Sequence, residues 1–312
     1  MPTGTNANAR PESFTVPTLI KGRPTELHGL RINGQAYQIS RGIVKTARLL
    51  EEWYEDVDHP DEIIAAMRRD RVADILTFVQ RWPDVSPRYP FYREYEQWAV
   101  LPITTYDAWW NNDISGRTRG MLRKSQKSLD LRVVDWTDEF VNGITAIFNE
   151  TPIRQGRPFW HYGKSADVVR EQFSRYLFRE TLIGAYVGDQ LVGFIMLANA
   201  GRFALTGQIL SLISHRDKST NNALIAKAVE VCAERGIPAL IYLHWGTGAF
   251  SEFKRRCGFQ RTEVPRYYVP LTFKGRCALA SRLHDGYRSL VPVSLQERVK
   301  DLRRAWYERG QA

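Results

Sequence analysis

The sequence has few of the features that mark a secreted or membrane-spanning protein. Its three cysteines are odd in number and scattered, which indicates neither a disulfide framework nor a zinc motif. No apolar run reaches the roughly 20 residues that a membrane-spanning helix needs. The first residues, MPTGTNANARPESFTVPTLIKG, contain no continuous apolar core of the signal-peptide type. We therefore expect a cytoplasmic protein whose residues 1–25 form a disordered lead.

The sequence also offers little support for metal or covalent catalysis. The six histidines show no ligand-like spacing, so we predict no metal site. Cys257 follows Lys254, Arg255 and Arg256, whose charges would lower the pKa of its thiol. No histidine and acid partners are evident beside it in the sequence, so we interpret Cys257 as a structural cysteine.

Positive charge is what the chain has in excess. The net charge is +10, and residues 115–134 carry six basic residues against one acidic residue. The tail from residue 273 carries nine against four, and apolar residues recur at helical spacing within 280–308. Basic surfaces suit phosphate-bearing ligands, nucleic acid or an anionic membrane, and they also occur as ordinary solvated surface. For the tail two expectations stay open, which are peripheral contact with an anionic membrane and packing on its own domain.

The first half of the chain alternates between helical and strand-like segments. Between Pro60 and Pro83, apolar residues recur at three-to-four spacing, which predicts one helix over residues 61–82. Further helices are predicted over 106–129, 137–150 and 165–180, with Thr137 as an N-cap, and strands over 96–104 and 129–136. This alternation predicts a sheet-and-helix architecture of the α/β (α+β) class.

Residues 180–260 form the most informative stretch. Two strand-like segments flank Gly188-Asp189, which is the signal of a β-hairpin turn. A third apolar run over 203–214 ends in a polar turn. An amphipathic helix (223–236), a buried-looking strand (237–245) and the segment FSEFKRRCGFQ (250–260) follow.

Three local features carry a family resemblance. RKSQKSLDLRV (123–133) is a basic helix that runs into a strand, residues 182–236 give a hairpin, strand, turn and helix, and FKRRCGF occupies 253–259. In this order they resemble the GNAT acyltransferase fold, most of all the divergent branch that includes the Fem-type aminoacyltransferases. The resemblance implies a GNAT-like mixed sheet flanked by helices, in two GNAT-like halves. We place these halves at 26–135 and 136–272, the second being catalytic, before a basic helical tail over 273–312.

The resemblance also locates a donor loop, and there the sequence departs from the family. GNAT enzymes hold the coenzyme A pyrophosphate on a (Q/R)-x-x-G-x-(G/A) loop, where glycines permit close approach and a helix N-terminus favours the anion. Residues 216–222 read RDKSTNN, without those glycines, as is also true of Fem-type enzymes. The missing glycines weaken the case for coenzyme A. The donor contacts implied by the resemblance are Arg216, Lys218, Ser219, Asn221, Asn222 and Lys254.

The polar residues of the second half suggest how an amine acceptor would be bound and deprotonated. Tyr242 and His244 lie two apart in a predicted strand and so would share a face, where His244 is a candidate proton acceptor. Gln208 on the preceding strand is a candidate substrate contact, and each of these residues fits ordinary sheet polarity as well. Residues 154–164 combine aromatic and cationic side chains in one loop, which predicts a substrate-binding lid. Its expected contacts are Arg157, Trp160, His161 and Tyr162, unless the aromatics fold onto the core.

The resemblance leaves three functions open. The first is a GNAT-type N-acyltransferase that moves an acyl group from acyl-CoA, with acetyl-CoA as the expected donor, to a small-molecule amine by direct attack. The second is a Fem-type transferase that uses aminoacyl-tRNA and a cell-wall precursor. The third is a non-catalytic relic of the fold that binds nucleic acid or a partner.

Overall fold

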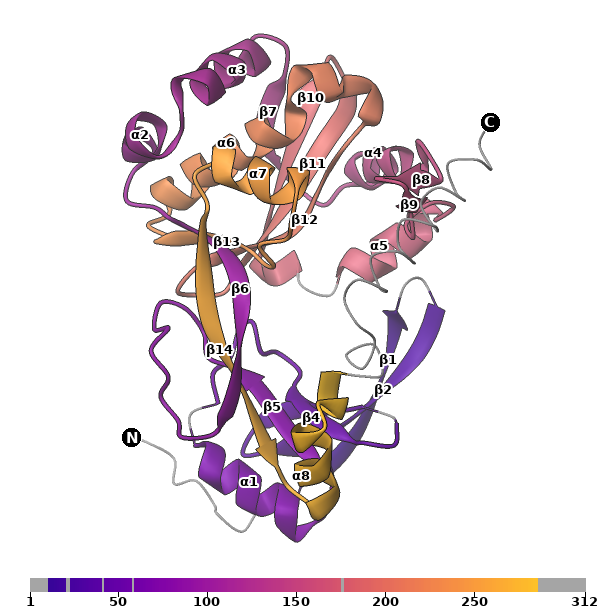
Figure 1. Cartoon of the computed structure of the whole chain (residues 1–312). Coiled ribbons are helices and arrows are strands. Elements are labelled where there is room, and N and C mark those ends of the chain that lie inside the picture. The colour runs from indigo at the N-terminus through magenta and orange to yellow at the C-terminus, as the bar shows by residue number, and fades with distance from the viewer. Residues whose placement is uncertain (1–10, 21–22, 41, 58, 175–176, 286–312) are drawn as a thin grey trace, which may run out of the picture. The chain divides into compact units, whose positions relative to one another are not determined.

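The computed structural model describes residues 11–20, 23–40, 42–57, 59–174 and 177–285 (Figure 1). The chain divides into two compact units. The first comprises the described residues up to 95, residues 155–158 and those from 264 onward, and the second comprises 96–154 and 159–263. This division differs from the expected boundary at residue 135, because residues 96–134 pack with the later part of the chain. The predicted tail helix beyond residue 285 lies outside the described residues.

The first unit is a sheet with two helices. Its strands lie in the order β1 (Glu12–Ile20), β2 (Arg23–Ile32), β3 (Gln35–Ile39), β4 (Thr46–Leu49), β5 (Ile75–Val79) and β14 (Gln260–Pro270). All neighbours are antiparallel except β4 and β5, which are parallel. Helix α1 spans Pro60–Arg69, α8 spans Phe273–Ala280, and a short 3-10 turn, η4, spans Leu283–Asp285.

Two expectations for this unit are wrong. Residues 12–20 are not a disordered lead but a strand, paired with β2 from Glu12 opposite Arg31 to Ile20 opposite Arg23. The ring of Phe14 lies so close over Gly29 that a Cβ there would be 2.3 Å from it. The helix predicted over 61–82 ends at Arg69, and residues 75–79 form β5 with five buried side chains in succession. A short apolar run of this kind has no periodicity that separates a buried strand from a buried helix.

The second unit is a mixed sheet with helices on both faces. Its strands lie in the order β6 (Tyr92–Pro102), β13 (Ala239–Tyr242), β12 (Ala204–Ser211), β11 (Gln190–Asn199), β10 (Glu180–Val187) and β7 (Asp130–Val134). The pair β12–β13 is parallel and the others are antiparallel. The expected mixed sheet flanked by helices is therefore confirmed, as is the hairpin at Gly188.

Helices and turns connect these strands. After β6 come α2 (Tyr106–Ala108), a π-helix η1 (Trp109–Asp113) and α3 (Gly116–Gln126), where one continuous helix was predicted. After β7 come α4 (Asp138–Asn149), the short pair β8 (Ile153–Arg154) and β9 (Arg157–Pro158), α5 (Ala166–Ser174) and η2 (Leu177–Arg179). Thr137 caps α4 as predicted, since its hydroxyl accepts from the N–H of Phe140. The remaining elements are η3 (Ile213–Lys218), α6 (Thr220–Glu234) and α7 (Ala249–Arg256).

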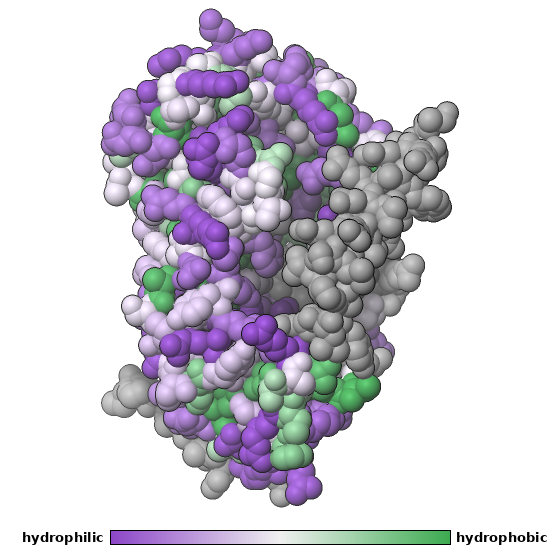
Figure 2. All heavy atoms as spheres, in the orientation of Figure 1, coloured by the Kyte–Doolittle hydropathy of each residue, from purple (hydrophilic) through white to green (hydrophobic). Residues whose placement is uncertain are grey.

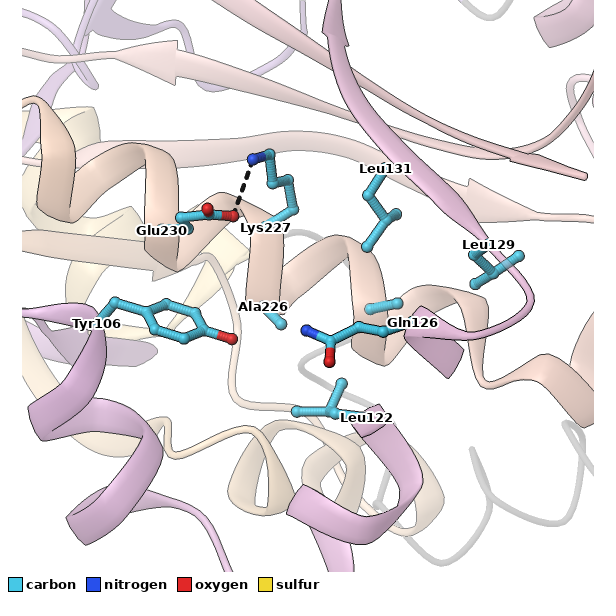
Figure 3. A pocket seen from close by; sticks show the side chains of 9 residues that line it. Tyr106, Leu122, Gln126, Leu129, Leu131, Ala226, Lys227 and Glu230 are labelled. Atoms are coloured by element: carbon cyan, nitrogen blue, oxygen red, sulfur yellow. Dashed lines mark ion pairs between the residues drawn. The ribbon is translucent and has the colours of Figure 1, made fainter. Parts of the chain in front are cut away.

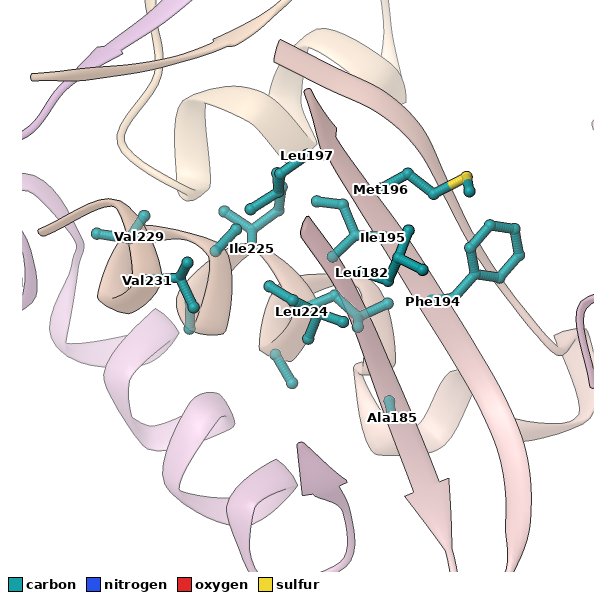
Figure 4. Packing of buried hydrophobic residues seen from close by; sticks show 14 of the residues in the cluster. Leu182, Ala185, Phe194, Ile195, Met196, Leu197, Leu224, Ile225, Val229 and Val231 are labelled. Carbon is teal, nitrogen blue, oxygen red and sulfur yellow. The ribbon is translucent and has the colours of Figure 1, made fainter. Parts of the chain in front are cut away.

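The hydrophobic core of this unit fills both faces of β11. Figure 4 shows Ile195 and Leu197 of β11 beside Leu224 and Ile225 of α6. On the opposite face, the ring of Phe194 meets Phe140 and Phe148 of α4. Each such side chain contributes about 1.5–3 kcal/mol when it is removed from water. The sheet is thus held rigidly between α6 and α4, and its two faces can be assigned to these helices.

Candidate active site

The site begins where two parallel strands separate. β12 and β13 pair only at Ala204 with Leu240 and at Leu205 with Ile241. β12 then continues to Ser211 beside β11, while β13 and the residues after it follow β6, with Trp245 N–H bonded to the carbonyl of Gln97 at 2.7 Å. The backbone of β12 from residue 206 onward therefore has no β13 partner in the described structure. Such a separation exposes main-chain groups to a ligand between the strands.

A bulge marks the same point on β12. Its register with β11 shifts between Leu197, which is opposite Thr206, and Met196, which is opposite Gln208. Gly207 is the extra residue, and a bulge redirects the chain and its side chains. A Cβ added at Gly207 would lie 3.9 Å from Oε1 of Glu180, the first residue of β10. The fold therefore brings a carboxyl group against the bulge from two strands away.

Within the described part of the chain, the Glu180 carboxyl group has no hydrogen-bonding or charged partner. Its Oε2 is buried there without a hydrogen bond. Burial raises the pKa of Glu180 to about 7, because the charged form loses its water without gaining an opposite charge. A carboxyl group with this pKa exchanges protons near neutrality, as a general base must. Sequence reasoning missed it, and the available signal was an acid that opens an otherwise apolar strand.

Gln208 shares the face of Glu180. Glu180 and Leu182 alternate onto one face of β10, Leu182 is opposite Met196, and Met196 is opposite Gln208. This is the α4 face of the sheet. Gln208 is half-buried there. The structure thus places one predicted substrate contact on the same face as the unpaired carboxyl group.

The expected pair of Tyr242 and His244 is not formed. β13 ends at Tyr242, and His244 is exposed with a left-handed backbone (φ 60°). The two side chains therefore do not alternate onto one strand face, which removes the reason for choosing His244 as the proton acceptor. Tyr242 is half-buried, and burial raises the pKa of its hydroxyl to about 12, which keeps it protonated at neutral pH.

Lys254 lies under the end of β13 rather than on a surface. It is fully buried, and its ammonium group donates to the carbonyl oxygens of Leu243 (3.3 Å) and His244. It also lies 4.1 Å from the ring centres of both Tyr242 and Phe250. Burial lowers the pKa of Lys254 to about 8. The lysine expected to meet a donor phosphate therefore orders the chain after β13.

The predicted donor loop has the backbone of a glycine turn without the glycine. Ser219 adopts a left-handed conformation (φ 54°, ψ 38°) at the N-cap of α6. Arg216 is exposed, and Lys218 is half-buried beside Asp217. Asn221 keeps a buried side-chain oxygen without a partner. Arg216 and Lys218 thus still precede the N-terminus of α6, although the Ser219 side chain occupies the position where the family has glycine.

Asn222, also predicted to contact the donor, has a partner within the protein. Its amide donates to the sulfur of Cys257 at 3.4 Å. Cys257 is buried, and burial raises the pKa of its thiol to about 12. The thiol stays protonated near neutrality, which fits the structural interpretation of this cysteine.

A carboxylate that the sequence did not single out holds the start of this loop. Glu150, the C-cap of α4, accepts hydrogen bonds from the N–H groups of Ile213 (2.7 Å) and Ser214 (2.9 Å) and pairs with Arg154 (2.9 Å). Arg154 in turn donates to the carbonyl of Ser211 at 2.9 Å. Burial acts to raise the pKa of Glu150, but the hydrogen bonds and Arg154 outweigh it and lower that pKa. The end of β12 is therefore fixed to α4 by an ionised clamp.

The predicted lid is partly exposed and partly core. Trp160 and Tyr162 are 48% and 47% exposed, whereas His161 is 1% exposed and stacks on Phe148 at 4.0 Å. Burial, together with Lys164 and Arg154, lowers the pKa of His161 to about 3, so the imidazole is neutral. Arg157 is exposed and belongs to the first unit, so it is not among the residues that this unit brings together.

A small apolar cavity lies beside α6. It has a volume of about 220 Å³ and is lined by α2, α3, α6 and the start of β7. Figure 3 shows Leu122, Leu129 and Leu131 on its sides, with the Lys227–Glu230 ion pair of α6 (2.8 Å) at its edge. Because its only charges neutralise each other, we assign it no chemical role. Within the described ranges, no three histidine, cysteine or acidic residues gather in a metal-binding group, and no helix is long and apolar enough to cross a membrane.

The comparisons with known proteins show the fold. No protein-family model and no curated protein matches the sequence. Among solved structures, the chain is similar to FemX, with a TM-score of 0.54 at 9% identity over 82% of this chain and 88% of that one. It is also similar to the C-terminal domain of a putative lysylphosphatidylglycerol synthetase from Agrobacterium fabrum, with a TM-score of 0.53 at 14% identity over 82% and 89%. The Fem-like fold expected from the sequence is therefore confirmed.

Proposed function

We propose that the protein is an acyltransferase in which Glu180 accepts the proton of an attacking amine. The observation that carries this proposal is the Glu180 carboxyl group beside the Gly207 bulge, where β12 leaves β13. Its Oε2 is buried and has no hydrogen bond among the residues that the structure describes. The amine nitrogen attacks the acyl carbon, and a C–N bond forms while the bond from that carbon to its carrier breaks. Glu180 takes a proton from the nitrogen, and the carrier leaves with the electron pair of the broken bond. No covalent enzyme intermediate is required.

The donor that we propose first is an acyl-CoA, with acetyl-CoA as the simplest case. Arg216 and Lys218 precede the N-terminus of α6, where backbone N–H groups and the helix dipole favour a phosphate. The left-handed turn at Ser219 supports the same position, because it is the backbone shape of a phosphate-binding glycine loop. The thioester would then extend from this loop along the free edge of β12 toward Gly207.

The acceptor that we propose is a small-molecule amine. Gln208 lies on the Glu180 face, and Trp160 and Tyr162 expose aromatic surface on the segment that follows the Glu150 clamp. Aromatic faces and an amide suit a polar ring-bearing or cationic substrate. Arg157 remains a proposed contact that rests on the sequence alone.

A second candidate is aminoacyl transfer from tRNA, and two observations favour it. The Ser219 side chain stands where a coenzyme A loop has glycine. In addition, α3 exposes Arg117, Arg123 and Lys124, and hydrophilic side chains cover the top of the face seen in Figure 2, over α3. A basic helix surface suits the phosphates of RNA.

Ligand-induced stabilisation distinguishes these candidates. We expect acetyl-CoA to raise the melting temperature saturably, because it binds only the native state, and we expect the Arg216→Ala, Lys218→Ala double variant to lose this shift. An Arg202→Ala variant, which changes a cation away from the loop, is the matched control. Salt-sensitive binding of charged tRNA without a coenzyme A shift would favour the second candidate. No response to either ligand would leave a non-catalytic binding protein.

A further inference from the structure

A second cavity of this unit, larger than the one beside α6, is not used by the proposed reaction. It has a volume of about 570 Å³ and lies between the N-terminal half of α3 and the C-terminal half of α7. Its lining is formed by Asp113, Ser115, Arg117, Thr118, Met121, Glu252, Arg255 and Arg256. None of these residues belongs to the donor loop, the Glu150 clamp or the Glu180 face. Its volume lies within the range of small-molecule sites.

Two of its three arginines are held in fixed positions by one carboxylate. Arg255 donates to both oxygens of Glu252 at 2.8 and 2.9 Å, and Arg256 donates from Nε at 2.8 Å. These bonds leave both terminal nitrogens of Arg256 without a bond to Glu252, and the Arg256 side chain is 54% exposed. Guanidinium groups that are already oriented lose less entropy when they bind an anion.

The third arginine is uncommitted. Among the described residues, Arg117 has no hydrogen bond or ion pair, and it lies in the first turn of α3. Ser115 caps this helix by accepting from Thr118 N–H, and Arg119 closes the preceding π-helix by donating to the carbonyls of Trp110, Asn111 and Ile114. The positive end of the α3 dipole therefore faces the same cavity as Arg117.

The charges of the cavity match a phosphate group. Three guanidinium groups against the carboxyl groups of Glu252 and Asp113 leave an excess of one positive charge. Burial raises the pKa of Asp113, whereas Arg255 and Arg256 lower the pKa of Glu252 to about 2. Guanidinium pairs bind phosphate oxygens through short, directed hydrogen bonds.

We propose that this cavity binds a phosphate-bearing ligand of about nucleotide size, with Arg117 and Arg256 on the phosphates. The proposal does not rest on acyl transfer. The phosphates could belong to a free nucleotide or to the nucleotide end of the acyl carrier. Both ligands would present the same phosphate groups to the two arginines. A cavity of this volume, rather than a flat basic surface, argues for a discrete ligand instead of a continuous nucleic-acid backbone.

Calorimetric titration with inorganic pyrophosphate and with ADP at constant ionic strength tests the site. We expect saturable binding that weakens about tenfold in Arg117→Gln and in Arg256→Gln, because each loses a charge-assisted hydrogen bond. Lys124→Gln is the matched control, since it removes one charge from the exposed surface of the same helix outside the cavity. Because no described residue forms a hydrogen bond or ion pair with Arg117, the Arg117→Gln variant should have the same melting temperature as the wild type.

Unsaturable binding, or equal weakening in all three variants, would overturn the proposal in favour of nonspecific charge attraction. Competition then identifies the source of the phosphates. Displacement of pyrophosphate by coenzyme A would assign the cavity to the acyl carrier, and simultaneous binding would assign it to a separate nucleotide. A Glu180→Gln variant should bind pyrophosphate unchanged, so that a failure of the proposed chemistry and a failure of this site can be told apart.

Discussion

Replacing Glu180 by glutamine should make the protein less active and more stable at the same time. The substitution keeps the size of the side chain and removes its charge and its ability to accept a proton. If Glu180 is the general base, turnover should fall by about 10²- to 10⁴-fold. The wild-type rate should rise with pH and reach half of its maximum near pH 7, because the carboxylate form is the active one. The variant should lack this dependence.

The stability change follows from the same pKa. The pKa of Glu180 is raised from 4.5 to about 7, so the folded state binds the proton more tightly than the unfolded state does. The folded protein therefore loses stability as the pH rises from about 4.5 to about 7, and above that range the full cost is present. At 1.36 kcal/mol per unit the cost is about 3 kcal/mol, which partial solvent access reduces to roughly 1–2 kcal/mol.

Urea unfolding of both proteins at pH 5 and pH 8 measures this cost directly. We expect the variant to exceed the wild type by roughly 1–2 kcal/mol at pH 8 and the difference to shrink toward zero at pH 5. A variant with full turnover would show that Glu180 is not the base. An equal stability difference at both pH values would show that Glu180 titrates normally, and the argument from burial would be wrong. Asp189→Asn, an exposed acid of the same unit, is the control for charge alone.

Three further perturbations test the surroundings of the site. Ser219→Gly should raise the free energy of unfolding by roughly 0.5–1 kcal/mol, because glycine accepts the left-handed conformation without steric cost, whereas Asn222→Gly inside α6 should lower it. Glu150→Gln should destabilise the protein by about 1–3 kcal/mol at neutral pH. The pKa of Glu150 is lowered in the folded state, so the stability that the Glu150 carboxylate contributes should vanish as the pH falls through that lowered pKa. Trp160→Ala should raise the KM for the acceptor about tenfold. The melting temperature should change little, since the side chain is 48% exposed. A large loss of stability with an unchanged KM would show that Trp160 is a core residue instead.

Local sequence patterns predicted the elements whose formation depends only on residues close together in the chain. The Gly188 hairpin, the Thr137 cap of α4 and the helical periodicity of α6 each depend on neighbours in the chain, and the structure contains all three. The order of three short motifs was also enough to identify the fold. By contrast, the sequence pattern assigned β5 to a helix, because five successive residues that are all buried show no strand or helix period.

The sequence by itself determined the fold class and the succession of strands from β10 to β13 in the second unit. Tertiary structure alone decided which polar residues are chemically unusual. His244 is exposed beyond the end of its strand. Glu180 instead holds a buried Oε2 two strands away from the Gly207 bulge, and Glu150 meets Ile213 across 63 residues of chain. The physical reason is that helix and strand formation depends on short-range periodicity. A raised pKa instead depends on desolvation and on missing partners, which are set by residues distant in the sequence.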